Sequence, residues 1–323
     1  MSDSPSPLFV TIPPGTPSAR ADKLLAELLP EHTRAAIQGW IKLGLVTRDD
    51  RPISQKQKLS GGEILRVVIP PAEEIIHQPE NVPLDVVHED DDILVINKPT
   101  GLVVHPGAGN PGATLLNGVL FHCPDNATLP RAGVVHRLDK GTTGLMVVAK
   151  TELARQSLIA QLETRQMKRR YLAVVEGILV SGLSVDKPIG RHRHDRLKMA
   201  VTSTGKPAIT HFRVKQKFRR HTLLQAELET GRTHQIRVHL GHIGHTIVGD
   251  KTYGNRNHVP RGAGEDLVRC IQSYDHQALH AFSLSLDHPR STERLAWEAE
   301  LPEDMARLVA LLAEDAEESA SQD

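Results

Sequence analysis

Asp139 lies in a segment that contains basic residues and glycines, His136–Gly144, between two apolar runs of the chain. A carboxylate in such a loop can act on a substrate as a nucleophile or as a general base. An aspartate in a glycine-containing turn more commonly hydrogen-bonds to its own backbone, as in an Asx turn. Taken alone, the segment favours this structural role, so a catalytic role needs support from other parts of the chain.

The segment Gly107–Gly112 formally matches the G-x-G-x-x-G pattern of dinucleotide-binding turns. In such turns a strand leads directly into the glycines and a helix follows them. Here prolines interrupt the approach, and Pro111 has no amide hydrogen that could face a pyrophosphate. The pattern favours a plain glycine loop, and a nucleotide-dependent oxidoreductase is the weakest of the functions considered.

Four closely spaced histidines raise the question of a metal site, because imidazole is a common metal ligand: His234, His239, His242 and His245. The spacing lacks the His-Glu-x-x-His pattern, and no cysteine is nearby. If Thr233 caps a helix over residues 234–243, His239 lies away from the side that His234 and His242 share. We therefore expect structural or phosphate-contacting histidines and no metal.

Four motifs are distributed in order along most of the chain. They are Asn97–His105, His136–Lys150, Tyr171 after three basic residues, and Thr230–His239. This ordered set closely resembles the A/D family of ribosomal large-subunit pseudouridine synthases, and several motifs in the right order are more specific than any one of them. The aspartate of the second motif is the family's catalytic residue, so the resemblance implies that role for Asp139.

The resemblance also implies a substrate. Within the family, the stretch His105–Asn110 together with the N-terminal domain described below looks most like the branch that modifies the loop of helix 69 in large-subunit ribosomal RNA. The expected partner is therefore this RNA, free or in a pre-ribosomal particle. Isomerisation involves no redox change, so we expect no nicotinamide, flavin, metal or other cofactor.

Partners for Asp139 follow from the same resemblance. Arg237 is the cation that keeps the carboxylate ionised in a pocket that excludes water. Arg137 fills the stack that a flipped uridine leaves. Tyr171 stacks on the flipped base or moves its proton. Whether Asp139 acts as a nucleophile on the sugar or as a base toward it stays open at this point.

Basic residues elsewhere are candidate RNA contacts, because cations bind phosphates. Two dense basic runs, 191–198 and 215–220, contain few apolar residues. The complete set of expected RNA contacts besides Arg137 is His136, Arg20, Lys23, Arg34, Lys42, Arg191, Arg193, Arg196, Lys198 and Arg232. A solvated loop is the alternative for the basic runs.

The N-terminal part has the pattern of a small unit with two helices. Leucines repeat at helical spacing before Pro30, and Thr33 can cap a second helix that carries Ile37 and Trp40 on one face. Short extended segments near 45–47 and 64–69 predict a small sheet. The pattern resembles the S4 RNA-binding domain over residues 17–72. It departs from that domain at residues 48–51, where S4 domains usually have a Val-Asn-Gly-Lys-type turn.

The remaining boundaries follow from composition. Residues 1–16 are rich in Pro and Ser and are expected to be a flexible tail. Residues 73–83 are acidic and proline-punctuated, as in a linker. Residues 84–313 mix a few helices with strand-like runs at 93–97, 134–138, 145–149, 171–175 and 223–228. The resemblance implies a pseudouridine synthase domain with a bent, largely antiparallel sheet and flanking helices. Residues 314–323 are expected to be an acidic, disordered tail. The fold class is α+β.

Composition narrows the cellular setting. The chain of 323 residues is 39% hydrophobic and 24% charged, and it has no apolar run near the roughly 20 residues that cross a bilayer. Its two cysteines favour a reducing cytoplasm. Acids concentrate in residues 71–92 and 301–323, so the net charge of zero conceals a basic body suited to nucleic acid. We expect a cytoplasmic monomer that binds no membrane.

One alternative of a different class stays open: an S4-containing RNA-binding or assembly factor with a silent second domain. The combination of Asp139, Tyr171 and Arg237 distinguishes the two, because a protein that only binds RNA does not need all three.

Overall fold

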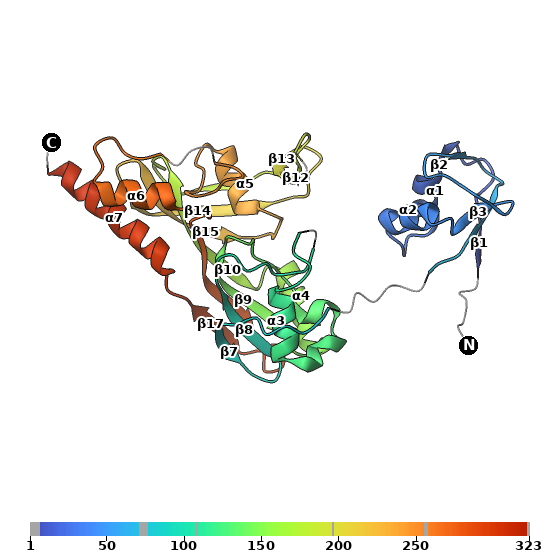
Figure 1. Cartoon of the computed structure of the whole chain (residues 1–323), viewed down its shortest axis with the longest axis horizontal. Coiled ribbons are helices and arrows are strands. Elements are labelled where there is room, and N and C mark those ends of the chain that lie inside the picture. Colours follow the sequence, from blue (N-terminus) through green and yellow to red (C-terminus); the bar gives the residue numbers. More distant parts are fainter. Residues whose placement is uncertain (1–6, 71–76, 108, 196, 255–257, 322–323) are drawn as a thin grey trace. The chain divides into compact units, whose positions relative to one another are not determined.

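The structure is a computed structural model that describes residues 7–70, 77–107, 109–195, 197–254 and 258–321. The chain divides into two compact units, Met1–Ile76 and His77–Asp323 (Figure 1). Each unit has a hydrophobic core of its own. No helix among the described residues is both long and apolar enough to pass through a bilayer.

The N-terminal unit packs two helices against a small antiparallel sheet. Its elements are β1 (Leu8–Thr11), β2 (Ala19–Arg20), α1 (Ala21–Leu28), α2 (Arg34–Lys42), β3 (Val46–Arg48), β4 (Arg51–Pro52), β5 (Lys58–Leu59) and β6 (Ile64–Val67). The main sheet has the order β1-β6-β3-β4. The predicted cap is confirmed, since the Thr33 hydroxyl accepts from the Ala36 amide at 3.2 Å. Ile37 and Trp40 are buried in the core as expected.

The expected flexible tail over 1–16 is wrong for its ordered part. Residues 8–11 form β1, which pairs antiparallel with β6 from Leu8↔Val67 to Thr11↔Ile64. Val10 and Ile12 are buried in the core. The short run Leu-Phe-Val-Thr has high strand propensity. The prediction missed this strand because it relied on the prolines and serines around it. Residues 1–6 lie outside the described part of the chain.

The second unit is built on a nine-stranded mixed sheet. Its strands are β7 (Val86–Glu89), β8 (Ile93–Lys98), β9 (Thr143–Ala149), β10 (Lys168–Glu176), β11 (Leu183–Asp186), β14 (Ile209–Lys217), β15 (His221–Leu228), β16 (Leu279–Asp287) and β17 (Arg294–Glu298). The order is β11-β14-β15-β10-β16-β9-β8-β7, with β17 on β16. Among the strands that the structure describes, β16 and β9 are the one parallel pair, so the sheet is largely antiparallel and the α+β class is confirmed.

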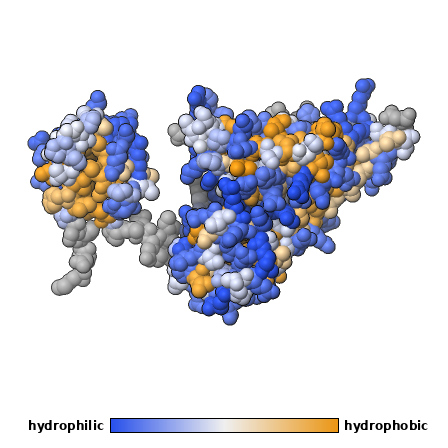
Figure 2. Space-filling view, turned by 180° about the vertical axis from the view of Figure 1, so that it is seen from behind, coloured by the Kyte–Doolittle hydropathy of each residue, from blue (hydrophilic) through white to orange (hydrophobic). Residues whose placement is uncertain are grey.

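Helices cover both faces of this sheet (Figure 1). They are α3 (Leu115–His122), α4 (Glu152–Glu163), α5 (Gln235–His242), α6 (Glu265–Ser273) and α7 (Glu303–Ala320), with 3₁₀ turns at Pro124–Thr128 and Pro130–Gly133. Alternate residues of β8 and β9 enter two separate cores, because successive strand residues face opposite sides. Hydrophilic residues dominate the surface of the second unit in Figure 2, and hydrophobic residues form separate patches.

The disorder expected over 314–323 is wrong for the described residues, since α7 continues to Ala320. Residues 322–323 lie outside the described part of the chain. Met305, Leu308 and Leu312 form one buried stripe of this helix, and Asp315 extends the stripe. The Asp315 carboxylate pairs with Arg219 at 3.0 Å. This continuous buried face, together with many strong helix formers, keeps the acidic residues helical.

The expected linker over 73–83 belongs partly to the second unit, which begins at His77. The side chain of Asn117 on α3 donates to the Gln78 carbonyl at 2.7 Å, and the Glu80 amide donates to the Asn117 carbonyl at 3.1 Å. These bonds hold residues 77–83 along α3. Residues 71–76 lie outside the described part of the chain.

Candidate active site

The loop that carries Asp139 precedes β9. The predicted strand over Val134–Leu138 is reduced to one isolated bridge, Val134↔Val148. At the other end of the loop, Gly144 has φ of +109°, and a Cβ there would lie 2.3 Å from the Ala281 carbonyl oxygen of β16. Only glycine therefore permits the close parallel contact between β9 and β16. This contact fixes the end of the Asp139 loop.

Asp139 forms the predicted ion pair with Arg237. Nη1 of Arg237 donates to Oδ2 of Asp139 at 2.9 Å, and the two side chains are 6% and 16% exposed respectively. Burial by itself lowers the pKa of Arg237. The hydrogen bonds that Arg237 donates to Asp250 and the negative charges of Asp250 and Asp139 have the larger, opposite effect, so the pKa is raised above its ordinary value. The cation is therefore permanent, and it lies where it stabilises the Asp139 carboxylate.

Helix α5 positions Arg237, but the expected Thr233 cap is wrong. The N-cap residue is His234, which has a left-handed backbone with φ of 57° and forms no side-chain cap bond. The Gln235 side chain fixes the start of α5 instead. Its oxygen accepts from the Arg232 amide at 3.0 Å and from the Thr230 hydroxyl at 2.8 Å. Its amide nitrogen donates to the Ile209 carbonyl of β14 at 2.9 Å, so the start of α5 is tied to the sheet.

Tyr171 lies on β10 and is 5% exposed. The pairing of β10 with β16 shifts register between Arg170 and Leu172, so Tyr171 sits at an irregularity of the ladder. Burial raises the pKa of its phenol, and the nearby Asp139 charge acts in the same direction. The ring therefore stays neutral and keeps its proton at physiological pH.

Arg137 and His136 have different environments. Arg137 is exposed, and its guanidinium makes no hydrogen bond within the described part of the chain. The His136 ring is turned inward, and its Nε2 accepts from the Val147 amide of β9 at 3.1 Å. Burial lowers the pKa of His136 to about 3, so the ring is neutral. This placement disfavours the predicted contact of His136 with RNA and gives it a role in holding the loop.

Lys98 is a site residue that the sequence reasoning missed as an individual side chain. It ends β8, is fully buried, and donates to the carbonyls of Pro99 at 2.7 Å, Leu102 at 3.0 Å and Lys140 at 3.3 Å. Burial lowers its pKa to about 7. Because Lys140 follows Asp139, Lys98 holds the Asp139 loop from its buried side. A lysine that closes an apolar strand is the signal that could have identified it.

The basic hairpin of the second unit is formed by β12 (Ile189–Arg191) and β13 (Met199–Val201). It carries the predicted contacts Arg191, Arg193 and Lys198, and Arg193 is exposed. The predicted contact Arg196 lies outside the described residues. Arg232 is nearer α5, and its Nε donates to the Pro207 carbonyl at 3.0 Å.

The predicted contacts of the N-terminal unit divide into two kinds. Arg20 and Arg34 both bind the buried carboxylate of Asp22, at 2.9 and 2.8 Å, while remaining 44% and 48% exposed. The Arg20 bond, with those from Gln38 and Arg34, outweighs burial and lowers the pKa of Asp22. Lys23 and Lys42 are exposed lysines on α1 and α2. Asp22 thus holds two arginines at the surface.

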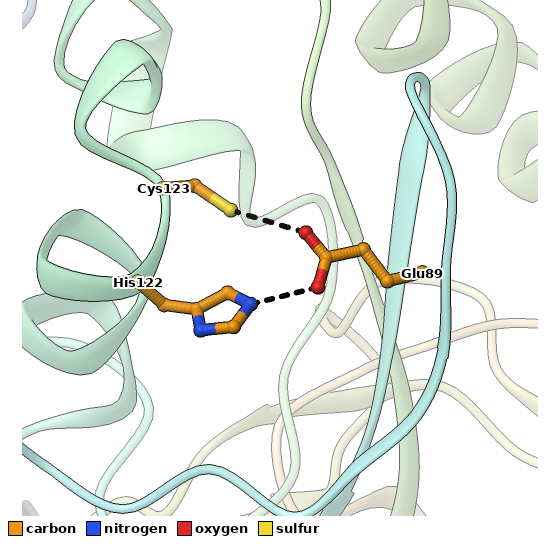
Figure 3. A group of neighbouring side chains, drawn as sticks. All are labelled: Glu89, His122 and Cys123. Carbon is orange, nitrogen blue, oxygen red and sulfur yellow. Dashed lines mark hydrogen bonds and ion pairs between the residues drawn. The ribbon is translucent and has the colours of Figure 1, made fainter.

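Two of the four closely spaced histidines that were weighed as metal ligands contact protein groups. His239 contacts the Thr210 hydroxyl at 2.9 Å and the Lys187 carbonyl at 3.0 Å, and His245 contacts the Glu176 carbonyl at 2.9 Å. A different group, Glu89, His122 and Cys123, brings three possible ligand atoms within 4.8 Å of one another (Figure 3).

This second group is poorly suited to a cation as it stands. The Lys150 ammonium already binds Glu89 Oε1 at 2.8 Å. Burial, together with the charge of Glu89, raises the pKa of the Cys123 thiol, which opposes the thiolate form that binds metals.

Comparison with known proteins identifies the class. Residues 92–242 match the family described as RNA pseudouridylate synthase, and the chain belongs to this family of isomerases. It is 49% identical over 300 residues to ribosomal large subunit pseudouridine synthase D of Vibrio vulnificus, covering 93% of this chain and 92% of that one. It is 47% identical over 309 residues to the protein of the same name from Haemophilus influenzae, covering 95% of each chain.

Solved structures agree. Human RNA Pseudouridylate Synthase Domain Containing 4 matches with a TM-score of 0.55 at 26% identity, over 71% of this chain and 92% of that one. Human RNA Pseudouridylate Synthase Domain Containing 1 matches with a TM-score of 0.51 at 25% identity, over 73% and 97%.

Proposed function

We propose that this protein converts specific uridines of large-subunit ribosomal RNA to pseudouridine, in the loop of helix 69, with Asp139 as the essential carboxylate. The substrate follows from the names of its relatives, and the helix 69 loop from the motif resemblance. The observation that carries the proposal is the Asp139–Arg237 pair, in which a part-buried carboxylate shares one hydrogen bond with a permanent cation.

The reaction explains why such a carboxylate is needed. The bond from uracil N1 to ribose C1′ breaks, the base turns, and C5 forms a bond to the same C1′. The C5 proton is lost and N1 gains one, so atoms balance without oxidation or reduction. Asp139 acts either as a nucleophile on the sugar or as a base toward it. In both roles it must stay ionised away from bulk water, and Arg237 stabilises that state.

Access to the base requires flipping. Moving a uridine out of a folded RNA loop costs about a few kcal/mol. We propose that Arg137, two residues before Asp139, occupies the vacated stack, and the exposure of its side chain supports this role. The neutral, buried ring of Tyr171 supplies a stacking surface for the flipped base, and its raised pKa favours this role over proton transfer.

The proposed RNA contacts outside the catalytic loop are cationic. In the second unit they are Arg191, Arg193, Arg196, Lys198 and Arg232. In the N-terminal unit we propose an S4-type surface formed by Arg20, Lys23, Arg34 and Lys42. The two-helix architecture and the exposure of these four side chains support that assignment.

The proposed enzyme needs no cofactor, because the substrate loses and gains nothing but a proton. One chain supplies Asp139, Arg237 and Tyr171, which is what a monomeric enzyme requires. A ribosomal RNA substrate and two free cysteines fit a cytoplasmic protein.

The test is to map pseudouridines in ribosomal RNA from cells with and without the gene, and after complementation with wild type, Asp139→Asn or the exposed control Asp266→Asn. The helix 69 modifications should disappear with the gene and return with wild type and Asp266→Asn only. Purified Asp139→Asn should bind RNA within about twofold of wild type while losing isomerisation, because the amide cannot act as nucleophile or base. Unchanged RNA in cells without the gene would favour an RNA-binding assembly factor, and activity in Asp139→Asn would overturn the mechanism.

A further inference from the structure

Arg237 is shared between two carboxylates, and the sharing is unequal. Its Nε and Nη2 donate to Oδ2 and Oδ1 of Asp250 at 2.7 and 2.8 Å, which is a two-point contact. Its Nη1 donates to Oδ2 of Asp139 alone. Since a guanidinium is planar and rigid, the contact with Asp250 fixes the direction in which Nη1 points.

Asp250 is itself held firmly. Its side chain is 1% exposed, and Oδ1 also accepts from the amides of Thr252 at 2.9 Å and Tyr253 at 3.2 Å. Gly249 precedes it with φ of +78°, and a Cβ there would lie 2.0 Å from the His276 carbonyl oxygen. The turn that presents Asp250 therefore cannot shift easily, and neither can the arginine bound to it.

Tyr253 restrains the same arginine from a second direction. Its ring centroid lies 5.0 Å from Cζ of Arg237, within the range of a cation–π contact. Its hydroxyl accepts from the Met199 amide at 2.8 Å and contacts Nδ1 of His234 at 2.8 Å. When the Tyr253 hydroxyl donates this hydrogen bond, Nδ1 of the neutral His234 is the acceptor and Nε2 carries the ring proton. Nε2 lies 3.9 Å from Oδ1 of Asp139.

The restrained Arg237 does not bind the second oxygen of Asp139, Oδ1. Within the described part of the chain, Oδ1 of Asp139 has no hydrogen-bond partner, and the His234 ring is too far away to provide one. An arginine without Asp250 would be free to turn its two-nitrogen edge to Asp139 and bind both carboxylate oxygens. A carboxylate engaged on both oxygens is a weaker nucleophile and a weaker base.

We propose that Asp250 and Tyr253 are positioning residues for the isomerisation: they hold Arg237 so that it binds only Oδ2 of Asp139 and leaves Oδ1 available to the uridine. The proposal rests on the proposed catalytic role of Asp139. It assigns Oδ1 as the reacting oxygen, whichever of the two chemical roles Asp139 takes.

The experiment compares wild type, Asp139→Asn, Asp250→Asn, Asp250→Glu and Tyr253→Leu, which removes the ring beside Arg237, with the exposed residues of Asp266→Asn and Glu318→Ala as controls outside the site. Single-turnover rates on a helix 69 RNA, RNA dissociation constants and thermal midpoints are measured for each purified full-length variant. Asp250→Asn should lower the rate at least about tenfold, and Tyr253→Leu by about threefold or more, with RNA affinity within about twofold. Asp250→Glu should recover part of the rate, since it restores the charge. The controls should match wild type.

The outcomes separate the two proposals. An inactive wild type would overturn the proposed function, whereas an active wild type with inactive Asp139→Asn and fully active Asp250→Asn would overturn only the positioning role. A crystal structure of Asp250→Asn should show Arg237 on both oxygens of Asp139, and an unmoved Arg237 would contradict the inference. If Asp250→Asn does not fold, Tyr253→Leu decides, and a wild-type rate in that variant would overturn the proposal.

Discussion

At the scale of single residues, the Asp139 loop is held by buried basic side chains on both of its sides. Arg237 contacts the carboxylate of Asp139, while Lys98 binds the Lys140 carbonyl one residue later in the chain. Among the described residues, the hydrogen-bond partners of Lys98 are all carbonyls, and burial lowers its pKa to about 7. The protein therefore tolerates a buried ammonium in order to hold the loop.

Lys98→Met should change the dependence of stability on pH. The unfolded lysine binds its proton up to a pKa near 10.5 but the folded one only to about 7, so between these values the unfolded state binds more protons. Wild type should therefore gain stability relative to Lys98→Met as pH rises from 7 to 10, by up to about 1.4 kcal/mol per pH unit.

Urea unfolding at pH 7, 8 and 9 measures the difference in the free energy of unfolding between the two proteins. The fluorescence of Trp297 reports the unfolding, in a Trp40→Phe background so that only the second unit is observed. Other titrating groups are common to both proteins and cancel. Parallel pH dependences for the two proteins would contradict a depressed pKa at Lys98.

At the scale of elements, the site depends on contacts between segments far apart in sequence. The parallel contact of β9 with β16 fixes one end of the Asp139 loop, and Gln235 ties the start of α5 to β14. Helix α7 packs beside α6 and reaches back to Arg219, after β14 (Figure 1). The C-terminal residues are thus part of the folded unit.

Asp315→Ala should destabilise the second unit. Asp315 is 8% exposed, and its removal leaves the partly buried Arg219 without this partner. Breaking a largely buried ion pair costs on the order of 3 kcal/mol. Differential scanning calorimetry of the full chain should show a lower midpoint for the second unit, whereas the exposed control Glu318→Ala should leave it unchanged. Equal midpoints for wild type and Asp315→Ala would favour the disordered tail that composition alone suggests.

At the scale of the whole molecule, the two units have separate cores and separate proposed tasks. The second unit carries the complete Asp139–Arg237–Asp250 network. The N-terminal unit carries exposed cations, for which we propose phosphate contacts. We therefore expect substitutions in the N-terminal unit to alter RNA binding without altering the chemical step.

The double substitution Lys23→Ala with Lys42→Ala tests this division. These lysines are preferable to Arg20 and Arg34, whose loss would leave the buried Asp22 carboxylate with fewer partners. The RNA dissociation constant should rise, and the slope of log affinity against log salt should decrease by up to about 2, since each phosphate contact contributes about 0.9. The single-turnover rate at saturating RNA should stay at the wild-type value.

The surface control replaces the exposed Lys56 by Ala. An unchanged dissociation constant for the double variant would contradict RNA binding by this surface. A lower rate at saturating RNA would show that the N-terminal unit contributes to the chemical step.

Local patterns were sufficient for much of the architecture. The Thr33 cap, the helix that follows it and strands β8, β9, β10 and β15 were predicted because each depends on residues close in sequence. The predictions failed at β1, α7 and the start of α5. There, pairing with β6, a buried stripe on the second unit and the Gln235 side chain decided the outcome.

Sequence by itself determined the class of the protein and the identity of Asp139, Arg237 and Tyr171 as candidates, because motif order is a property of the chain. Only the tertiary structure decided how their charges are shared. Asp139, Arg237 and Asp250 meet through the packing of a loop, a helix and a turn, and the direction of each hydrogen bond depends on that packing. The one-point contact with Asp139, the two-point contact with Asp250 and the buried ammonium of Lys98 are three-dimensional facts that no spacing along the chain contains.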